Sequence, residues 1–333
     1  MALKKGAVIG IGGIGIWHGQ MMRDTKRVDV CALCDARPAM QERAKEHFPE
    51  ATFYTSVEEM FAAEQIDLVA LAIPHNLHAP VAITALNAGA NVVVEKPMAT
   101  RYADCLAMIA AAKANKRFLT VFHNRRLDGW YLAAKSVIDD GLLGNLVEMQ
   151  SGINYRCGPE TWRGFKEAGG GIMYDWGAHL VDYLLHFAGS DVQSVSGSFY
   201  RAPDADPALN EDHGSVRINF ASGATGVVTI SAIDHSSPLR YKLVGDKGTL
   251  TDEWQWTDTD KLKVFTRLSG GEQTVMEVTY RKTVPQRYYD NVVDSLYEGT
   301  QPRVTPESAA KIINIFNTAE RSFAEGGVPL PLE

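Results

Sequence analysis

GIGGIG at Gly10–Gly15, preceded by the apolar residues Ala7–Ile9, is the stretch that decides the fold. A strand that enters a G-x-G-x-x-G turn and continues into a helix presents free N–H groups and the positive end of the helix dipole to a pyrophosphate. Asp35 ends the next apolar run, where a carboxylate can bind the ribose hydroxyls of NAD. This pattern predicts a dinucleotide-binding domain. Its expected NAD contacts are Gly10, Gly12, Gly13, Ile14, Gly15, Asp35, Ala36 and Arg37.

The composition is typical of a globular enzyme that acts on a small molecule. The chain has 333 residues, of which 45% are hydrophobic and 22% charged, and its formal net charge is −7. A chain of this length is expected to form two domains. The negative charge, without a basic tract, argues against nucleic acid or an anionic membrane as partner. We also recognise neither a signal peptide nor a membrane span, and therefore expect a cytoplasmic protein.

Strands and helices alternate over residues 1–123, which predicts an α/β domain of the Rossmann type with a doubly wound parallel sheet. The expected strands are 7–10, 28–35, 68–73, 91–95 and 118–122. Ligands of such sheets bind beyond the carboxyl ends of the strands. Residues at these ends are therefore further candidates for cofactor contacts, namely Ile73, Pro74, His75, Asn76, Glu95, Lys96 and Asn124.

Residues 124–333 have a different pattern, in which strand follows strand with short glycine or serine-glycine turns. It predicts an α+β domain for substrate binding and oligomerisation, with a large, mostly antiparallel open sheet. We expect helices on one face of this sheet. The uncovered face would then bury apolar surface against another copy, as a homodimer or homotetramer.

Lys96 directly follows the expected strand 91–95, next to where a nicotinamide would lie, although a solvated surface lysine is the alternative. Asp175, His179, Asp182 and His186 recur at helical spacing in an expected helix over 169–187. An imidazole can exchange a proton near neutral pH, and a carboxylate one turn away can orient it or a substrate hydroxyl. A structural pair is the alternative interpretation.

A metal site is a further interpretation of Asp175 and His179, with His123 or His213 as an added ligand. We favour no metal site, because hydride transfer to a nicotinamide requires no metal. Cys31 and Cys34 form a C-x-x-C pattern, but they lie within the expected strand 28–35 and no second pair follows. Buried packing therefore explains these cysteines better than a redox or zinc site.

Together these motifs resemble the glucose-fructose oxidoreductase and inositol dehydrogenase family of nicotinamide-dependent sugar oxidoreductases. The resemblance covers nearly the whole chain and includes the glycine turn, Pro74 with His78, the run into Glu95-Lys96-Pro97, Asn124-Arg125-Arg126, Trp162-Arg163, the 169–182 signature and Val304-Thr305-Pro306-Glu307. It implies that His179 accepts the hydroxyl proton, Lys96 holds the reacting oxygen and Asp175 binds hydroxyls. It also implies a cofactor role for His78, and substrate contacts from Lys96, Arg126, Tyr155, Trp162, Arg163, Asp175 and His179.

The predicted function is hydride transfer between NAD and a secondary alcohol or ketone of a sugar, sugar derivative or cyclitol. One alternative is redox-assisted glycoside cleavage through a 3-keto intermediate, which requires a second base from among Tyr155, His123 and His235. A non-catalytic NAD-binding regulator is the other alternative. The presence of all three implied catalytic residues argues against it.

Overall fold

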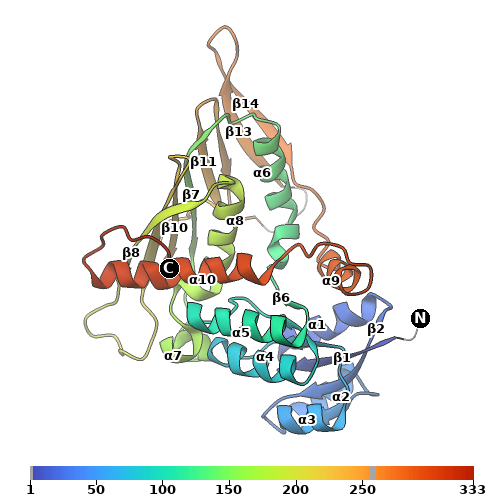
Figure 1. Cartoon of the computed structure of the whole chain (residues 1–333). Coiled ribbons are helices and arrows are strands. Elements are labelled where there is room, and N and C mark those ends of the chain that lie inside the picture. The colour runs from blue at the N-terminus through green and yellow to red at the C-terminus, as the bar shows by residue number, and fades with distance from the viewer. Residues whose placement is uncertain (1–2, 256–259) are drawn as a thin grey trace. The chain divides into compact units, whose positions relative to one another are not determined.

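The computed structural model describes residues 3–255 and 260–333, which fall into two compact units (Figure 1). The first unit runs to His123 and takes in Gln286–Lys311, and the second consists of Asn124–Pro285 and Ile312–Glu333. Within the part of the chain that is described, no helix is long and apolar enough to cross a membrane.

A parallel sheet of six strands, in the order β3-β2-β1-β4-β5-β6, forms the centre of the first unit. Its strands are β1 (Lys4–Ile9), β2 (Val28–Cys34), β3 (Thr52–Tyr54), β4 (Leu68–Leu71), β5 (Asn91–Val94) and β6 (Leu119–Val121). The helices are α1 (Gly13–Asp24), α2 (Met40–His47), α3 (Val57–Ala63), α4 (His78–Asn87), α5 (Tyr102–Asn115) and α9 (Arg287–Tyr297), with the 3-10 turn η1 (His75–Leu77). This strand order confirms the predicted Rossmann fold.

The strands of this sheet are apolar because helices cover both of its faces. All four residues of β4 are buried, as are the last four of β1. The sequence analysis missed β3, a three-residue strand at the edge of the sheet with no buried residue. Such a strand lacks the apolar run on which sequence recognition depends.

The segment that contains α9 packs with the first unit, whereas the sequence analysis placed all of 124–333 in the second domain. Two hydrogen bonds attach it to the edge strand β6: Tyr288 Oη donates to the Val121 carbonyl at 2.7 Å, and Thr120 Oγ1 donates to the Val304 carbonyl at 2.8 Å. The chain therefore returns to the parallel sheet after the antiparallel one. Sequence periodicity shows that these residues are helical but not which sheet they pack against.

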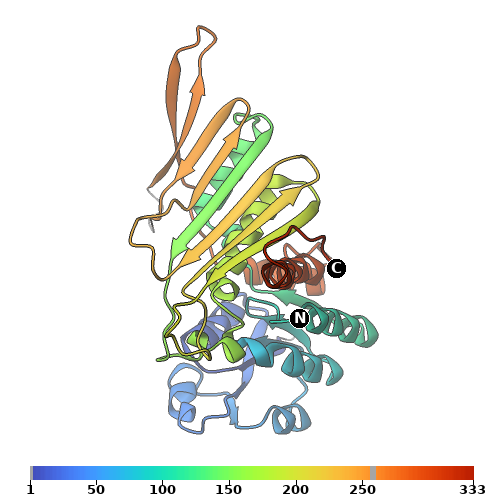
Figure 2. The ribbon, with the colours of Figure 1, turned by 90° about the vertical axis from the view of Figure 1, so that its left-hand side faces the viewer.

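The second unit is built on an eight-stranded sheet in the order β14-β13-β12-β11-β7-β10-β9-β8 (Figure 2). Its strands are β7 (Leu146–Asn154), β8 (Val192–Tyr200), β9 (His213–Phe220), β10 (Thr225–Ser231), β11 (Tyr241–Gly245), β12 (Gly248–Asp252), β13 (Lys261–Arg267) and β14 (Gln273–Thr279). Only β7 and β10 pair in parallel among these strands. The prediction of a large, mostly antiparallel sheet is confirmed.

Helices cover one face of this sheet, where α6 (Gly129–Asp139) and α8 (Ala178–Ala188) pack against its strands (Figures 1 and 2). The later part of α10 (Pro306–Ala324) lies against β8, where a Cβ added to Gly197 would come within 2.3 Å of the Ala319 carbonyl oxygen. The chain also forms the short elements η2 (Asn124–Leu127), η3 (Trp162–Gly164), α7 (Lys166–Gly169) and η4 (Met173–Gly177).

The face of the sheet turned away from α6 and α8 carries polar side chains as well as apolar ones such as Tyr200 and Val275, each 49% exposed. Side chains alternate between the two faces of a strand. Val216 and Ile218 of β9 are fully buried, whereas the intervening Arg217 is exposed. Gln150 of β7 is likewise exposed beside the fully buried Met149. This face therefore offers both polar and apolar surface to a partner.

The helix expected over 169–187 begins later than predicted. Gly170 and Gly171 have φ angles of 94° and 136°, a region that disfavours side chains and interrupts a helix. The turn η4 that follows is π-helical, and regular α-helix starts only at Ala178. Pi-helical turns inside α-helices occur frequently at functional sites.

Candidate active site

The glycine turn leaves room for a dinucleotide at the start of α1. Gly10 has a φ of 93°, and a Cβ there would lie 2.2 Å from the Ala72 carbonyl oxygen. A Cβ at Gly15 would lie 1.8 Å from the Gly10 carbonyl oxygen, so both positions require glycine. By contrast, a Cβ at Gly12 or Gly13 would meet no described atom within 4 Å. The backbone there borders open space beside the N-terminus of α1, which suits a pyrophosphate.

Asp35 lies just beyond β2 and is joined to the glycine turn. Its Oδ2 accepts the Ile11 N–H at 2.9 Å, and its two oxygens also accept Arg37 Nε at 2.9 Å and Nη2 at 3.0 Å. Burial alone would raise the pKa of Asp35, but the hydrogen bonds from Arg37 and Ile11 outweigh it and hold the pKa below its usual value. The carboxylate is thus ionised and fixed where the ribose of a bound dinucleotide is expected.

His78 joins the loops that follow β4 and β5. Its Nδ1 lies 2.8 Å from the Pro97 carbonyl oxygen, and its Nε2 lies 3.0 Å from that of Ile73. Burial lowers the pKa of this fully enclosed imidazole. His78 therefore has a supporting role next to Lys96, and its contact with the cofactor stays a prediction. His75 is buried beside His78, with their ring centroids 5.5 Å apart, whereas Asn76 is exposed.

Lys96 is positioned by a buried chain of side chains that the sequence analysis did not identify. Glu95 Oε2 accepts the Lys96 backbone N–H at 3.0 Å, and Glu95 Oε1 lies 3.0 Å from His18 Nε2. His18 Nδ1 in turn lies 2.6 Å from Tyr289 Oη. Burial would raise the pKa of Glu95, but the hydrogen bond and charge of His18 lower it. This Tyr289–His18–Glu95 chain fixes the backbone of Lys96 relative to α1, the helix that follows the glycine turn.

In the second unit, four of the predicted substrate-binding residues form one cluster. Tyr155 Oη donates to Asp175 Oδ2 at 2.8 Å, and Arg163 Nε lies 3.7 Å from the same oxygen. The Arg163 guanidinium also lies 4.4 Å from the ring centroid of Trp162. Burial and the neighbouring Asp175 raise the pKa of the Tyr155 phenol. A carboxylate surrounded by hydroxyl and guanidinium donors is well suited to bind the hydroxyl groups of a polyol.

His179 lies at the second position of α8 and is 5% exposed. The ring of Trp176 contacts both this imidazole and the cluster, because its centroid lies 5.9 Å from that of His179 and 6.5 Å from that of Tyr155. Asp175 belongs to the π-helical turn and His179 to α8, and the predicted pairing of these two side chains stays a prediction. The ring centroid of Trp176 also lies 5.4 Å from that of Trp254, a residue that no sequence signal marks.

Arg126 and Asp182 form a buried bidentate ion pair in which Arg126 Nε and Nη2 lie 2.8 and 2.6 Å from the two carboxylate oxygens. His186 Nε2 lies 3.6 Å from Asp182, one α-helical turn away. These contacts identify Asp182 as a structural partner of Arg126. The proposed substrate contact of Arg126 stays a prediction, as does the cofactor contact of Asn124 in η2.

No group of three His, Cys, Asp or Glu side chains with the geometry of a metal site occurs in residues 3–255 and 260–333. Cys31 and Cys34 are free thiols in β2. Burial raises the pKa of Cys34 to about 11, which makes it an unreactive packing residue.

Comparison with known proteins identifies the family. Residues 4–123 match an oxidoreductase family model with an NAD-binding Rossmann fold, and residues 131–251 match the model of the GFO/IDH/MocA C-terminal domain. The chain belongs to the GFO/IDH/MocA oxidoreductase family. It is an NAD-dependent oxidoreductase, and the open space at the glycine turn with the fixed carboxylate of Asp35 fits that cofactor.

Individual relatives of the GFO/IDH/MocA enzyme cover most of its length. An uncharacterized oxidoreductase of Schizosaccharomyces pombe is 31% identical over 261 residues, which are 75% of this chain and 70% of that protein. The scyllo-inositol 2-dehydrogenase (NADP(+)) IolW of Bacillus subtilis is 26% identical over 340 residues, covering 96% and 94% of the two chains. Among solved structures, the WlbA dehydrogenase of Bordetella pertussis in complex with NADH and UDP-GlcNAcA superposes with a TM-score of 0.82 at 25% identity, covering 100% and 99%.

Proposed function

We propose that this enzyme oxidises a secondary alcohol of a sugar, sugar derivative or cyclitol with NAD, or reduces the corresponding ketone. The observation that carries the proposal is the cluster of Tyr155, Arg163 and Asp175 in the second unit, in which the Asp175 carboxylate accepts a hydrogen bond from Tyr155 and forms an ion pair with Arg163. Relatives named as inositol 2-dehydrogenases support a polyol substrate.

Each catalytic residue has a separate role in this proposal. When bound, the nicotinamide of NAD accepts a hydride from the carbon that bears the reacting hydroxyl. His179 takes the proton from that hydroxyl as the carbonyl forms. The Lys96 ammonium stabilises the negative charge that develops on the oxygen, and Asp175 accepts hydrogen bonds from neighbouring substrate hydroxyls.

The experiment that tests this function is a substrate panel. The purified full-length chain is incubated with NAD and inositol stereoisomers, aldoses and glycosides, and NADH formation is recorded by absorbance. We expect NADH formation with at least one cyclitol or sugar and none with simple primary alcohols. Absence of turnover in both directions across the panel would contradict the proposal.

We predict that NAD is preferred over NADP because the ionised Asp35 repels a 2′-phosphate. Arg37 is held by Asp35, so Asp35→Ser should free its guanidinium to bind that phosphate. The ratio of kcat/KM for NAD to that for NADP should then fall by about 10-fold or more, equivalent to about 1.4 kcal/mol. Steady-state kinetics with both cofactors measure this ratio. Asp29→Ser, at an exposed position of β2, is the matched control and should leave this ratio unchanged. If the unmodified enzyme used NADP as well as NAD or better, the assignment of NAD as the preferred cofactor would be refuted.

Redox-assisted glycoside cleavage gains no support from Tyr155, one of the three candidate bases. Tyr155 donates a hydrogen bond to Asp175, and burial beside that carboxylate raises the pKa of the phenol. A phenol in this state does not act as a base near neutral pH. Glycoside cleavage would then need His123 or His235 as its second base, and simple dehydrogenation, which needs none, is the function that we propose.

We further propose that the open face of the eight-stranded sheet associates with a second copy of the chain. Because that face carries residues such as Gln150 and Arg217, the interface would include polar contacts. Light scattering at micromolar concentration should return a multiple of the chain mass, and the charge reversal Arg217→Glu should shift it towards the monomer. A monomeric mass for the unmodified chain would rule this association out.

A further inference from the structure

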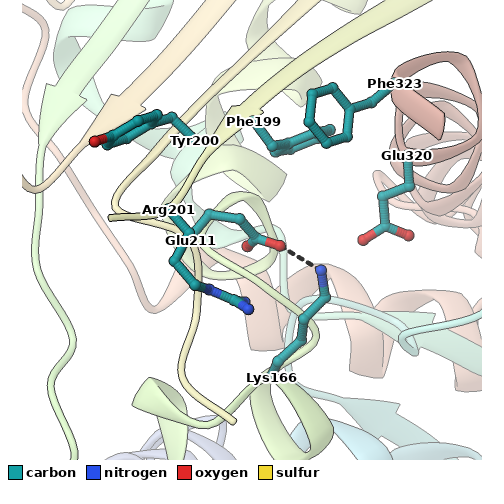
Figure 3. Close-up of a pocket in the computed structure, with 7 residues that line it drawn as sticks. All are labelled: Lys166, Phe199, Tyr200, Arg201, Glu211, Glu320 and Phe323. Carbon is teal, nitrogen blue, oxygen red and sulfur yellow. Dashed lines mark hydrogen bonds and ion pairs between the residues drawn. The ribbon is translucent and has the colours of Figure 1, made fainter. Parts of the chain in front are cut away.

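A pocket of about 600 Å³ in the second unit includes none of the residues that we propose to bind NAD or the alcohol substrate (Figure 3). Its walls come from the end of β8, from Lys166 of α7, from Glu211, and from Glu320 and Phe323 of α10. All of these residues belong to the second unit. The pocket is therefore a feature of that unit alone.

The terminal nitrogens of both basic groups of the pocket are engaged by protein atoms, whereas Arg201 Nε is buried without a hydrogen-bond partner among the described residues. Lys166 Nζ forms an ion pair with Glu211, drawn as the dashed line in Figure 3. Arg201 Nη1 and Nη2 donate to the carbonyl oxygens of Pro207 and Leu209 at 3.2 and 2.6 Å. An anionic ligand would have to compete with these partners, so the pocket is poorly suited to a phosphate or carboxylate.

Glu320 lacks a basic partner of this kind. Its Oε2 accepts a hydrogen bond from Tyr174 Oη at 3.3 Å, and within the described residues no Lys, Arg or His forms an ion pair with it. Burial raises the pKa of Glu320 to about 7. The positive charge of Lys166 opposes this rise and the negative charge of Glu211 adds to it. The hydrogen bond from Tyr174 also opposes the rise. In Figure 3 its carboxylate points towards the space beside Lys166.

Aromatic rings form the wall next to this carboxylate. The rings of Phe199 and Phe323 meet edge to face with centroids 5.6 Å apart. Phe323 is 48% exposed, as is the neighbouring Tyr200 at 49%, so apolar surface remains available to a ligand. Aromatic faces attract cations, and a carboxylate without a cation favours one.

We propose that this pocket binds a small organic cation, with its ammonium group on the Glu320 carboxylate and its apolar body against Phe199 and Phe323. The chemistry that it recognises is a positive charge next to an apolar or ring-shaped body. Binding converts Glu320 fully to its charged form, because the ligand supplies the missing counter-charge. This site is separate from the dehydrogenase residues and does not depend on the proposed substrate.

The test compares 2-phenylethylammonium with the neutral 2-phenylethanol, a ligand of similar size, by isothermal titration calorimetry on the full chain at pH 7. We expect saturable binding of the ammonium at millimolar concentrations or below, about 10-fold or more tighter than the alcohol. A pKa of about 7 leaves Glu320 about half protonated at pH 7. Titrations in two buffers of different ionisation enthalpy should therefore detect release of about half a proton per ligand.

Two variants make the result specific to this pocket. Glu320→Gln keeps the size of the side chain and should weaken ammonium binding by about 10-fold or more and abolish proton release. Phe323→Ala removes a half-exposed ring and should weaken binding without changing proton release. Glu325→Gln, at an exposed position just beyond α10, is the matched control and should behave as the unmodified chain.

Three outcomes would overturn the proposal: no saturable binding of 2-phenylethylammonium at millimolar concentrations, equal binding of the alcohol, or unchanged affinity and proton release in Glu320→Gln. Thermal unfolding of each variant shows whether it is folded. If Glu320→Gln is unfolded, Phe323→Ala decides the outcome, because unchanged binding in that variant excludes the pocket.

Discussion

His179→Ala should lower kcat for alcohol oxidation by about 10²–10⁴-fold, the usual contribution of a general base. The imidazole is only 5% exposed at the start of α8, so no bulk water molecule replaces it readily as the proton acceptor. The dissociation constant of NAD should stay nearly unchanged, because His179 is not among the residues expected to hold NAD, and all of those except Asn124 belong to the first unit. Steady-state kinetics and fluorescence titration of NAD measure the two quantities.

The pH profile separates proton transfer from a structural effect of the substitution. A neutral imidazole accepts the hydroxyl proton, so oxidation by the unmodified enzyme should increase as pH rises through the range in which histidines titrate. That increase should disappear in His179→Ala. His186→Ala, in the same helix and paired with Asp182, should retain both the rate and the profile. An unaltered kcat and profile in His179→Ala would assign the proton to another group.

The cofactor half of the site could be predicted from the sequence because its geometry is local. Gly10 and Gly15 are required by a φ of 93° and by contacts of 2.2 and 1.8 Å that a Cβ would make. Asp35 follows the next strand directly, and parallel strands bring their carboxyl ends to one edge of the sheet. Short sequence separations and a regular fold are sufficient for these predictions.

Residues that act through distant contacts were not predictable in this way. Tyr289 reaches His18 across 271 positions, because the segment around α9 packs with the parallel sheet. The π-helical turn at Met173–Gly177, which holds Asp175, likewise replaced part of an expected α-helix. Neither feature has a periodicity that a sequence pattern reveals. The one sequence signal for His18 is its position, three residues after the glycine motif on the helix that follows it.

The second large effect is expected at Lys96, where Lys96→Met keeps the length of the side chain but removes its charge. Loss of one donor that stabilises a developing oxyanion costs about 10²–10³-fold in kcat, and we expect a decrease of this size. The substrate KM should change much less, since the interaction strengthens only as negative charge develops on the oxygen.

A graded series at the same site distinguishes this role from a structural one. Glu95 accepts the Lys96 backbone N–H and contacts His18, so Glu95→Gln should misplace the ammonium and give a smaller decrease in kcat than Lys96→Met. Lys113→Met, at an exposed position of α5, is the matched control and should leave kcat unchanged. With a substrate deuterated at the reacting carbon, the kinetic isotope effect on kcat should increase in Lys96→Met, because the chemical step then limits turnover. Full kcat with an unchanged isotope effect would mean that Lys96 does not touch the reacting oxygen, and the stabilising charge would have to come from another residue.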